Sequence, residues 1–359
     1  MGTTCKARSP PGEAGGRGRL IRRPGEAGGP PGSDAPDLAP ARGSCGWPYS
    51  GARLRNTVDQ RAVLLALDVG NTQTVIGVFA DAGETGAPGP VSRSAGGPGP
   101  RDLDDLRYHW RLATVAGRTA DEYALLVTEL CRLVGLDLGG SGESGRISGI
   151  ALSSSVPVVT SALREMARTW FSMPVVVIEP GVRTGMPILY DNPKEVGADR
   201  VANAVGAIDL YGGPAIVVDL GTATTFDAIS AAGEYLGGAI TPGIEISMDA
   251  LFAQAAALPR VELVEPRHVI GKSTVESIRS GAIFGYTALV DGLCRKIEDE
   301  LGRSTVIATG GLAGLITPLS SAIEHHEPWL TLHGLRLVYE RNVDHAAAKG
   351  EPDEGGGIG

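Results

Sequence analysis

The segment 64–79, LLALDVGNTQTVIGVF, constrains the fold more than any other part of the chain. Apolar residues run up to Asp68, a small polar turn of Gly70, Asn71 and Thr72 follows, and β-favouring residues complete the segment. This pattern predicts two antiparallel strands joined by a tight turn. The small turn residues allow backbone N–H groups to approach an anion, and Asp68 stands where a carboxylate holds a hydrated metal ion.

A second segment, 215–229, repeats this arrangement as AIVVDLGTATTFDAI. Its Asp219, Gly221 and Thr222 occupy the corresponding places. One such hairpin is a weak signal, because many strands end in a glycine turn. Two of them in one chain predict two related half-domains that grip one nucleotide between them.

Length and charge narrow the class of protein. The chain has 359 residues, enough for two domains, and its 42% apolar content supports a substantial core. The net charge of −9 argues against a nucleic-acid-binding surface, and no helix-turn-helix with a basic face is visible. No apolar run reaches the roughly 18–20 residues of a membrane span. We therefore expect neither nucleic acid nor membrane as a partner.

The cysteines and histidines indicate no structural zinc. Cys5, Cys45, Cys131 and Cys294 are scattered without metal-ligand spacing, and the six histidines form no recognisable metal motif. Scattered cysteines are typical of free thiols in a reducing compartment, so we expect a cytoplasmic protein.

Composition divides the chain into ordered and disordered parts. Residues 1–61 are rich in Gly, Pro, Ala and Arg and bury too little apolar surface to fold, so we predict a disordered extension; a basic arm for a partner is the alternative. A second Gly/Pro-rich stretch predicts a flexible insertion. The predicted parts are an extension at 1–61, half-domains at 62–180 and 181–343 with the insertion at 81–101, and a polar tail at 344–359.

Strands and helices alternate after the first hairpin, which predicts an α/β fold with partly parallel sheets. The expected elements are a strand at 108–112, helices at 119–133 and 161–171, strands at 147–152 and 175–178, a helix after Gly197, a strand at 234–240 with a turn over Gly237–Gly243, a helix from Gly243 to about 257, a helix at 275–301 and a strand at 306–308.

Asp199 falls in the first turn of the helix that follows Gly197. A helix N-terminus stabilises an ionised carboxylate, and neighbouring N–H groups can hold a ligand. On position alone, Asp199 also fits the interpretation of an ordinary first-turn residue without a role in a site.

Six motifs in order resemble a known family across residues 63–342. They are Asp68–Thr72, Gly197–Arg200, Asp219–Thr225, Gly238–Gly243, Gly271–Thr274 and a closing pair, Leu335–Arg336 with Tyr339–Asn342. The organisation is similar to the actin/hexokinase/Hsp70 ATPase superfamily, and the motifs resemble type III pantothenate kinase. The resemblance implies two actin-like, ribonuclease H-like half-domains, each a mixed sheet flanked by helices.

The resemblance also implies a reaction, in which ATP and pantothenate give ADP and 4′-phosphopantothenate. It implies Mg²⁺ with ATP, a monovalent cation (K⁺ or NH₄⁺) near Asp219, Asp199 as proton acceptor, and a homodimer with sites near the interface, where Thr274 reaches the neighbour's site. The implied ATP-binding residues are Asp68, Val69, Gly70, Asn71, Thr72, Gln73, Thr74, Val75 and Thr222. The implied pantothenate-binding residues are Tyr190, Gly197, Ala198, Asp199, Arg200 and Thr274.

Two rival functions stay open at the level of sequence. The hairpins alone also fit a sugar or acetate kinase, although the motifs at 197–200 and 238–243 favour pantothenate. A non-catalytic nucleotide-binding regulatory protein of the same fold is the other rival, and Asp199 argues against it because a binding module needs no general base. Arg200 is predicted either to orient the acceptor or to pair with a carboxylate.

Overall fold

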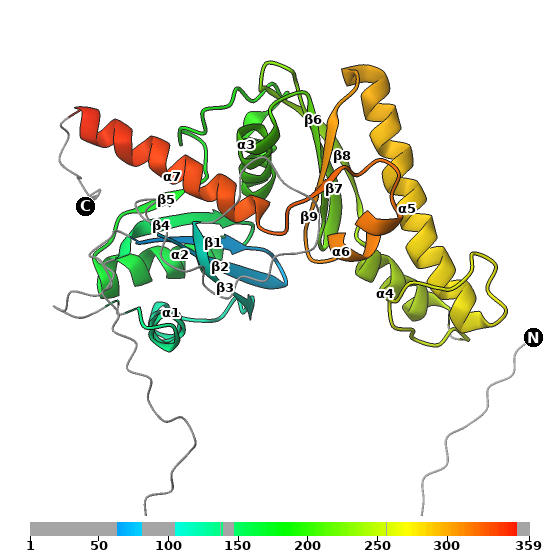
Figure 1. Ribbon diagram of the computed structural model, residues 1–359. Coiled ribbons are helices and arrows are strands. Elements are labelled where there is room, and N and C mark those ends of the chain that lie inside the picture. Colours follow the sequence, from blue (N-terminus) through cyan, green and yellow to red (C-terminus); the bar gives the residue numbers. More distant parts are fainter. Residues whose placement is uncertain (1–62, 81–104, 137, 139–146, 256, 350–359) are drawn as a thin grey trace, which may run out of the picture. The chain divides into compact units, whose positions relative to one another are not determined.

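The computed structural model describes residues 63–80, 105–136, 138, 147–255 and 257–349 (Figure 1). The side chains of residue 80 and of residues 345–349 are not described. All described residues belong to one of the chain's two units, Asn56–Gly359. The predicted extension at 1–61 and the predicted insertion at 81–101 lie outside the described residues.

The first sheet confirms the predicted hairpin. Its strands are β1 (Val63–Val69), β2 (Gln73–Ala80), β3 (Leu106–Ala113), β4 (Ile147–Ser154) and β5 (Val175–Val177). They lie in the order β3-β2-β1-β4-β5, with β2 antiparallel to β1 and β3, and β4 parallel to β1 and β5. Asp68 near the end of β1 pairs with Val75 of β2.

The second sheet repeats this topology. Its strands are β6 (Ala215–Leu220), β7 (Ala223–Ile229), β8 (Tyr235–Pro242), β9 (Thr305–Thr309) and β10 (His325–His326). The order is β10-β9-β6-β7-β8, with β7 antiparallel to β6 and β8, and β9 parallel to β6 and β10. In each sheet the strand that carries the Asp-x-Gly motif is central. The expected pair of mixed sheets flanked by helices is confirmed.

The helices cover the faces of these sheets (Figure 1). They are α1 (Ala120–Leu133), α2 (Pro157–Met166), α3 (Ala198–Tyr211), α4 (Ile244–Gln254), α5 (Thr274–Leu301), α6 (Ala313–Ile316) and α7 (Leu330–Lys349), with shorter helical turns at Ala167–Phe171, Pro193–Glu195 and Thr317–Leu319. Thr119 caps α1 in a capping box with Glu122. Within the described part of the chain, no helix combines the length and apolarity that crossing a membrane requires.

Three element boundaries differ from the sequence prediction. Helix α2 begins at Pro157, four residues before the predicted start, because proline fits the first position of a helix. The predicted turn over Gly237–Gly243 is wrong, since β8 runs through Pro242. A Cβ at Gly238 would lie 1.6 Å from the Phe226 carbonyl oxygen, so glycine serves the close approach of β7 and β8. Helix α4 begins after Gly243 as predicted but ends at Gln254.

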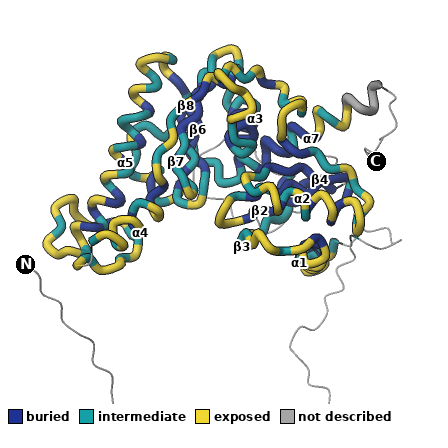
Figure 2. Tube along the Cα trace, turned by 180° about the vertical axis from the view of Figure 1, so that it is seen from behind, coloured by how far each residue is buried: buried dark blue, intermediate teal, exposed yellow. Residues whose placement is uncertain are grey.

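Alternation along the central strands sorts their side chains into separate cores. In β1, Leu65 and Leu67 pack with α1 and α2, whereas Leu64 and Ala66 join a cluster built with α3 and α7. In β6, alternate residues divide in the same way, and Ala215 and Val217 join that same cluster. Buried residues accordingly follow the strands, and the outer sides of the helices are exposed (Figure 2).

The apolar cluster shared by both sheets is bordered by two carboxylates, one from each central strand. One step beyond Leu64 and Ala66 on the same face of β1 is Asp68. One step beyond Ala215 and Val217 on the same face of β6 is Asp219. The apolar core that joins the two sheets therefore leads directly to two acidic side chains.

Candidate active site

The turns of the two predicted hairpins contact each other. The Oγ1 atoms of Thr72 and Thr222 lie 3.4 Å apart, and both residues are exposed. A backbone hydrogen bond closes each turn: the N–H of Gly70 donates to the Gln73 carbonyl, and the N–H of Gly221 donates to the Ala223 carbonyl. Two small-residue turns thus offer hydroxyl groups to one place on the surface.

The predicted ATP-binding residues form one continuous strip of this region. Val69 ends β1, Gly70 to Thr72 form the turn, and Gln73 to Val75 begin β2. Thr114, at the end of β3, supports the turn by donating from Oγ1 to the Gly70 carbonyl oxygen at 2.8 Å.

Three carboxylates influence one another beside these turns. Burial raises the pKa of Asp68 to about 7, and the charges of Asp199 and Asp219 add to this shift, while a Ser153 hydrogen bond opposes it. Burial likewise raises the pKa of Asp219 to about 7, with Asp199 contributing in the same direction. Mutual repulsion of this kind marks a place of strongly negative potential, which favours cations.

Neighbouring residues hold Asp219 in position. The buried Asn203 donates from Nδ2 to Asp219 Oδ2 at 2.9 Å and accepts from Thr331 Oγ1 at 2.7 Å. Gly310 follows β9 with a φ of +93°, and a Cβ there would lie 2.5 Å from Asp219 Oδ1. Only glycine satisfies both the positive φ and this close approach.

The donor set fits magnesium that arrives with a nucleotide. Among the residues that the structure describes, no three His, Cys, Asp or Glu side chains are grouped to hold a metal alone. Mg²⁺ typically keeps several waters and takes one or two carboxylates together with substrate phosphates. Asp68 and Asp219 provide such carboxylates next to the hairpin turns.

Asp199 lies in the first turn of α3, as the sequence predicts. Gly197 is the N-cap and Ala198 the first helical residue, and Asp199 Oδ1 accepts a hydrogen bond from the Arg200 backbone N–H at 2.8 Å. The electrostatic coupling of Asp199 to Asp68 and Asp219 brings the predicted base to the predicted phosphate site.

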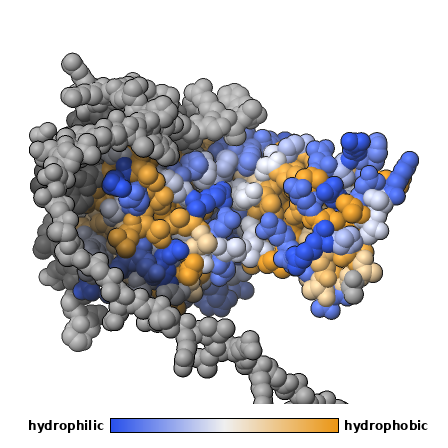
Figure 3. Space-filling model, turned by 90° about the horizontal axis from the view of Figure 1, so that it is seen from below, coloured by the Kyte–Doolittle hydropathy of each residue, from blue (hydrophilic) through white to orange (hydrophobic). Residues whose placement is uncertain are grey.

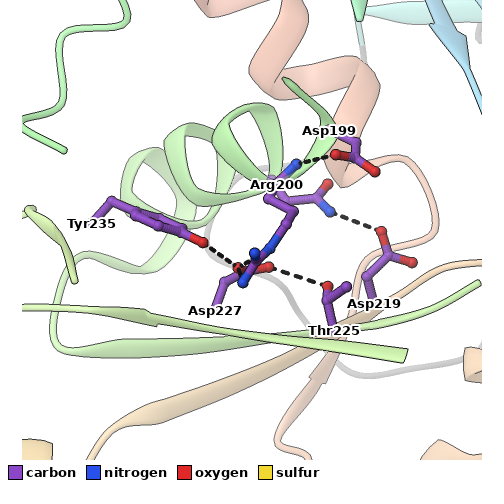
Figure 4. Close-up of polar contacts among 7 residues, drawn as sticks. Asp199, Arg200, Asp219, Thr225, Asp227 and Tyr235 are labelled. Carbon is purple, nitrogen blue, oxygen red and sulfur yellow. Dashed lines mark hydrogen bonds and ion pairs between the residues drawn. The ribbon is translucent and has the colours of Figure 1, made fainter. Parts of the chain in front are cut away.

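Arg200 is fixed by a buried carboxylate. Its Nε donates to Asp227 Oδ1 at 2.7 Å, and the Tyr235 hydroxyl donates to the same oxygen at 2.8 Å (Figure 4). Thr225 Oγ1 donates to the other Asp227 oxygen at 3.3 Å. Arg200 is 7% exposed and Asp227 is fully buried, so this ion pair lies inside the protein.

Burial governs the ionisation of this pair. It raises the pKa of Asp227 to about 6, although the charge of Arg200 and the hydrogen bonds from Arg200 and Tyr235 act in the opposite direction. Tyr190 completes the group, because its ring lies 6.3 Å from the Tyr235 ring between centroids. Tyr190 and Arg200 therefore form one cluster around Tyr235.

Thr274 is placed elsewhere. It is the first residue of α5 and lines an open groove of about 890 Å³ between α4 and α5, together with Met248, Leu251 and Tyr286. The structure of a single chain thus assembles the predicted ATP and acceptor residues but leaves Thr274 on a different surface.

The sequence prediction missed three residues of the site: Asn203, Asp227 and Tyr235. Asp227 had a detectable signal, because an acidic residue within the apolar segment Phe226–Ile229 requires a partner when it is buried. The other two have no local signal, since each acts through a contact between separate segments.

Comparison with known proteins identifies related sequences. The family model described as type III pantothenate kinase matches residues 64–296. A type III pantothenate kinase from Streptomyces griseus is 51% identical over 292 residues, which cover 79% of this chain and 100% of that protein. One from Moorella thermoacetica is 50% identical over 282 residues (78% and 100%), and one from Acidothermus cellulolyticus is 47% identical over 283 residues (78% and 99%).

Proposed function

The chain belongs to the type III pantothenate kinase family, and from this premise we propose that it transfers the γ-phosphoryl group of ATP to the 4′-hydroxyl of pantothenate. The products are ADP and 4′-phosphopantothenate, in the first step of coenzyme A synthesis. One observation carries the proposal: Asp199, on the first turn of α3, is coupled to Asp68 and Asp219 at the paired hairpin turns.

In this proposal the ATP phosphates lie against the strip of residues 68–75 and against Thr222. Backbone N–H groups of small turn residues suit phosphate oxygens. The 3.4 Å separation of the Thr72 and Thr222 hydroxyls supports a ligand held by both turns at once.

Asp68 and Asp219 face the cations. Mg²⁺ bound with ATP supplies neutralisation of charge on the transferred phosphoryl group. We assign a monovalent cation, K⁺ or NH₄⁺, to the neighbourhood of Asp219. The burial that raises the pKa of this carboxylate supports the assignment, because a nearby cation favours its ionised form.

Asp199 acts as proton acceptor. The pantothenate hydroxyl oxygen forms a bond to the γ-phosphorus while the bond from that phosphorus to the bridging oxygen of ADP breaks. The hydroxyl proton passes to Asp199 late in the displacement, a contribution of typically 10²–10⁴-fold.

Tyr190 and residues 197–200 hold pantothenate. We assign its carboxylate to the neighbourhood of Arg200, since a guanidinium matches a carboxylate in charge and geometry. The fixed orientation of Arg200 on Asp227 supports this role, because a preorganised partner costs less to order on binding.

The working form is a cytoplasmic homodimer in which Thr274 reaches the site of the neighbouring copy. Exposed apolar side chains support such an interface, among them Ile246 and Leu251 of α4 and Ile270 before α5. Figure 3 shows apolar surface in two areas, one beside the residues drawn in grey and one at the opposite end of the molecule, the end that carries α4 and the start of α5 in Figure 1. The position of Thr274 on this same surface fits a role in a second copy.

Pantothenate-dependent turnover tests the proposed function. Purified protein with Mg²⁺, K⁺ and ATP is expected to release ADP and form 4′-phosphopantothenate only when pantothenate is present. Asp199→Asn is expected to lower kcat by about 10²–10⁴-fold. Asp299→Asn, on the exposed side of α5, is the matched control and should keep full activity. ATP binding without turnover would instead favour a regulatory protein of the same fold.

A further inference from the structure

Arg111 of β3 lies on the same face of the first sheet as Asp68. Asp68 pairs with Val75 across β1 and β2, and Val75 pairs with Arg111 across β2 and β3. Residues paired in this way point to one side of a sheet. Two strand spacings separate Arg111 from Asp68 by about 10 Å, a distance that a long arginine side chain spans. The charge of Arg111 accordingly lowers the pKa of Asp68, against the larger effect of burial.

Contacts from separate segments hold the Arg111 guanidinium. Nη1 donates to Gln73 Oε1 at 3.3 Å, next to the first hairpin turn. The guanidinium carbon lies 5.5 Å from the ring centroid of Trp329, which precedes α7 and also stacks on His109 at 3.9 Å. The side chain is exposed, so its charge stays available to a ligand.

Arg111 also approaches the second sheet. A Cβ built on Gly311 would lie 3.9 Å from Arg111 Nη1. Gly311 belongs to the turn after β9, and the preceding Gly310 closely approaches Asp219. Arg111 therefore stands between the hairpin turn of one sheet and the β9 turn of the other.

The charge balance of the site favours a cationic side chain at this place, in addition to bound cations. Neither hairpin segment, 64–79 or 215–229, contains Lys or Arg. Arg200 is already bound to the buried Asp227. The phosphates of ATP carry several negative charges and would meet Asp68, Asp199 and Asp219. A positioned guanidinium offsets this repulsion and stabilises charge on the transferred group.

We propose that Arg111 binds the terminal phosphates of ATP. It thereby supplies the cationic side chain that both hairpin segments lack. This inference rests on the proposed kinase function, because it assigns Arg111 to the phosphate side of that site. The guanidinium donates hydrogen bonds to phosphate oxygens from β3, while the hairpin turns supply backbone N–H groups from β1 and β2.

One phosphate probe, one nucleoside probe and one activity assay test the proposal. Arg111→Gln is expected to lower kcat/KM for ATP by about 10²-fold, and Arg111→Lys should recover part of this loss. Inorganic tripolyphosphate, whose binding is measured directly by titration calorimetry, should bind Arg111→Gln at least tenfold more weakly than wild type, while adenosine should bind it as tightly as wild type. Arg168→Gln, an exposed arginine in the turn after α2, is the matched control.

The outcomes separate the two claims. Wild-type affinity for tripolyphosphate in Arg111→Gln would overturn the assignment of Arg111. An equal weakening of tripolyphosphate and adenosine would also overturn it, because a merely structural role affects the whole nucleotide. Absence of pantothenate-dependent turnover in the wild type would refute the kinase proposal, and the two binding probes would still report on Arg111.

Discussion

Asp227 makes the acceptor side of the site sensitive to acid. Its pKa is about 6, so it is ionised at pH 7.5 and protonated below pH 6. Protonation removes the charge that fixes Arg200. We expect kcat/KM for pantothenate to fall by up to about tenfold per pH unit below pH 6. Steady-state kinetics between pH 5 and 8 measure this dependence.

Replacement of Asp227 tests whether this residue causes the fall in kcat/KM for pantothenate below pH 6. Asp227→Asn should raise KM for pantothenate at pH 7.5 and flatten this part of the profile, because Arg200 then lacks its charged partner at every pH. Breaking a buried pair costs about 3–5 kcal/mol, so Tyr235→Phe provides a milder variant that keeps the charge but removes one hydrogen bond. If kcat/KM for pantothenate falls in the same way below pH 6 in Asp227→Asn, a group other than Asp227 causes the fall.

At the scale of elements, the turn after β9 depends on glycine at position 310. Gly310→Ala introduces a Cβ into the left-handed region and within 2.5 Å of Asp219 Oδ1. We expect the backbone strain alone to lower the free energy of unfolding by about 1–2 kcal/mol. We also expect kcat to fall, because the new Cβ displaces the Asp219 carboxylate. Thermal unfolding and pantothenate-dependent turnover measure the two effects.

Gly302 provides the matched control for this change. It ends α5 with a φ of +89°, and a Cβ there meets no atom within 4 Å. Gly302→Ala therefore carries the same backbone strain without the steric conflict, and it should lower the melting temperature by a few degrees while activity persists. Equal kcat values in the two variants would show that Asp219 tolerates the displacement.

The elements themselves were largely predictable, and the contacts between them were not. Continuous apolar runs ending at Asp68 and Asp219 marked both hairpins, because a strand that is buried on both faces needs apolar residues throughout. The glycines after Tyr235 were misinterpreted as a turn, since a close strand approach also selects glycine. Arg200 and Asp227 are 27 residues apart, so only the pairing of α3 with β7 brings them together.

At the scale of the whole molecule, the remote position of Thr274 predicts a shared site. If Thr274 acts in the neighbouring copy, each site combines Asp199 of one chain with Thr274 of the other. Co-expression of Asp199→Asn with Thr274→Ala should then restore activity, because one site of each mixed dimer receives both native residues. Random pairing makes half of the dimers mixed, so we expect about a quarter of wild-type kcat.

Each variant alone provides the baseline for that experiment. Asp199→Asn and Thr274→Ala homodimers should both show low turnover, and sedimentation velocity should give the mass of a dimer for both. Co-expressed protein no more active than the mean of the two homodimers would place Thr274 in the site of its own chain or outside any site.

The repeated topology has a consequence for how the chain can change over generations. Each sheet contributes one acidic residue from the equivalent position of its central strand, Asp68 from β1 and Asp219 from β6. Neither half, expressed as a separate fragment, would contain more than one of them. A lineage with this architecture cannot discard either sheet without losing one of these two carboxylates.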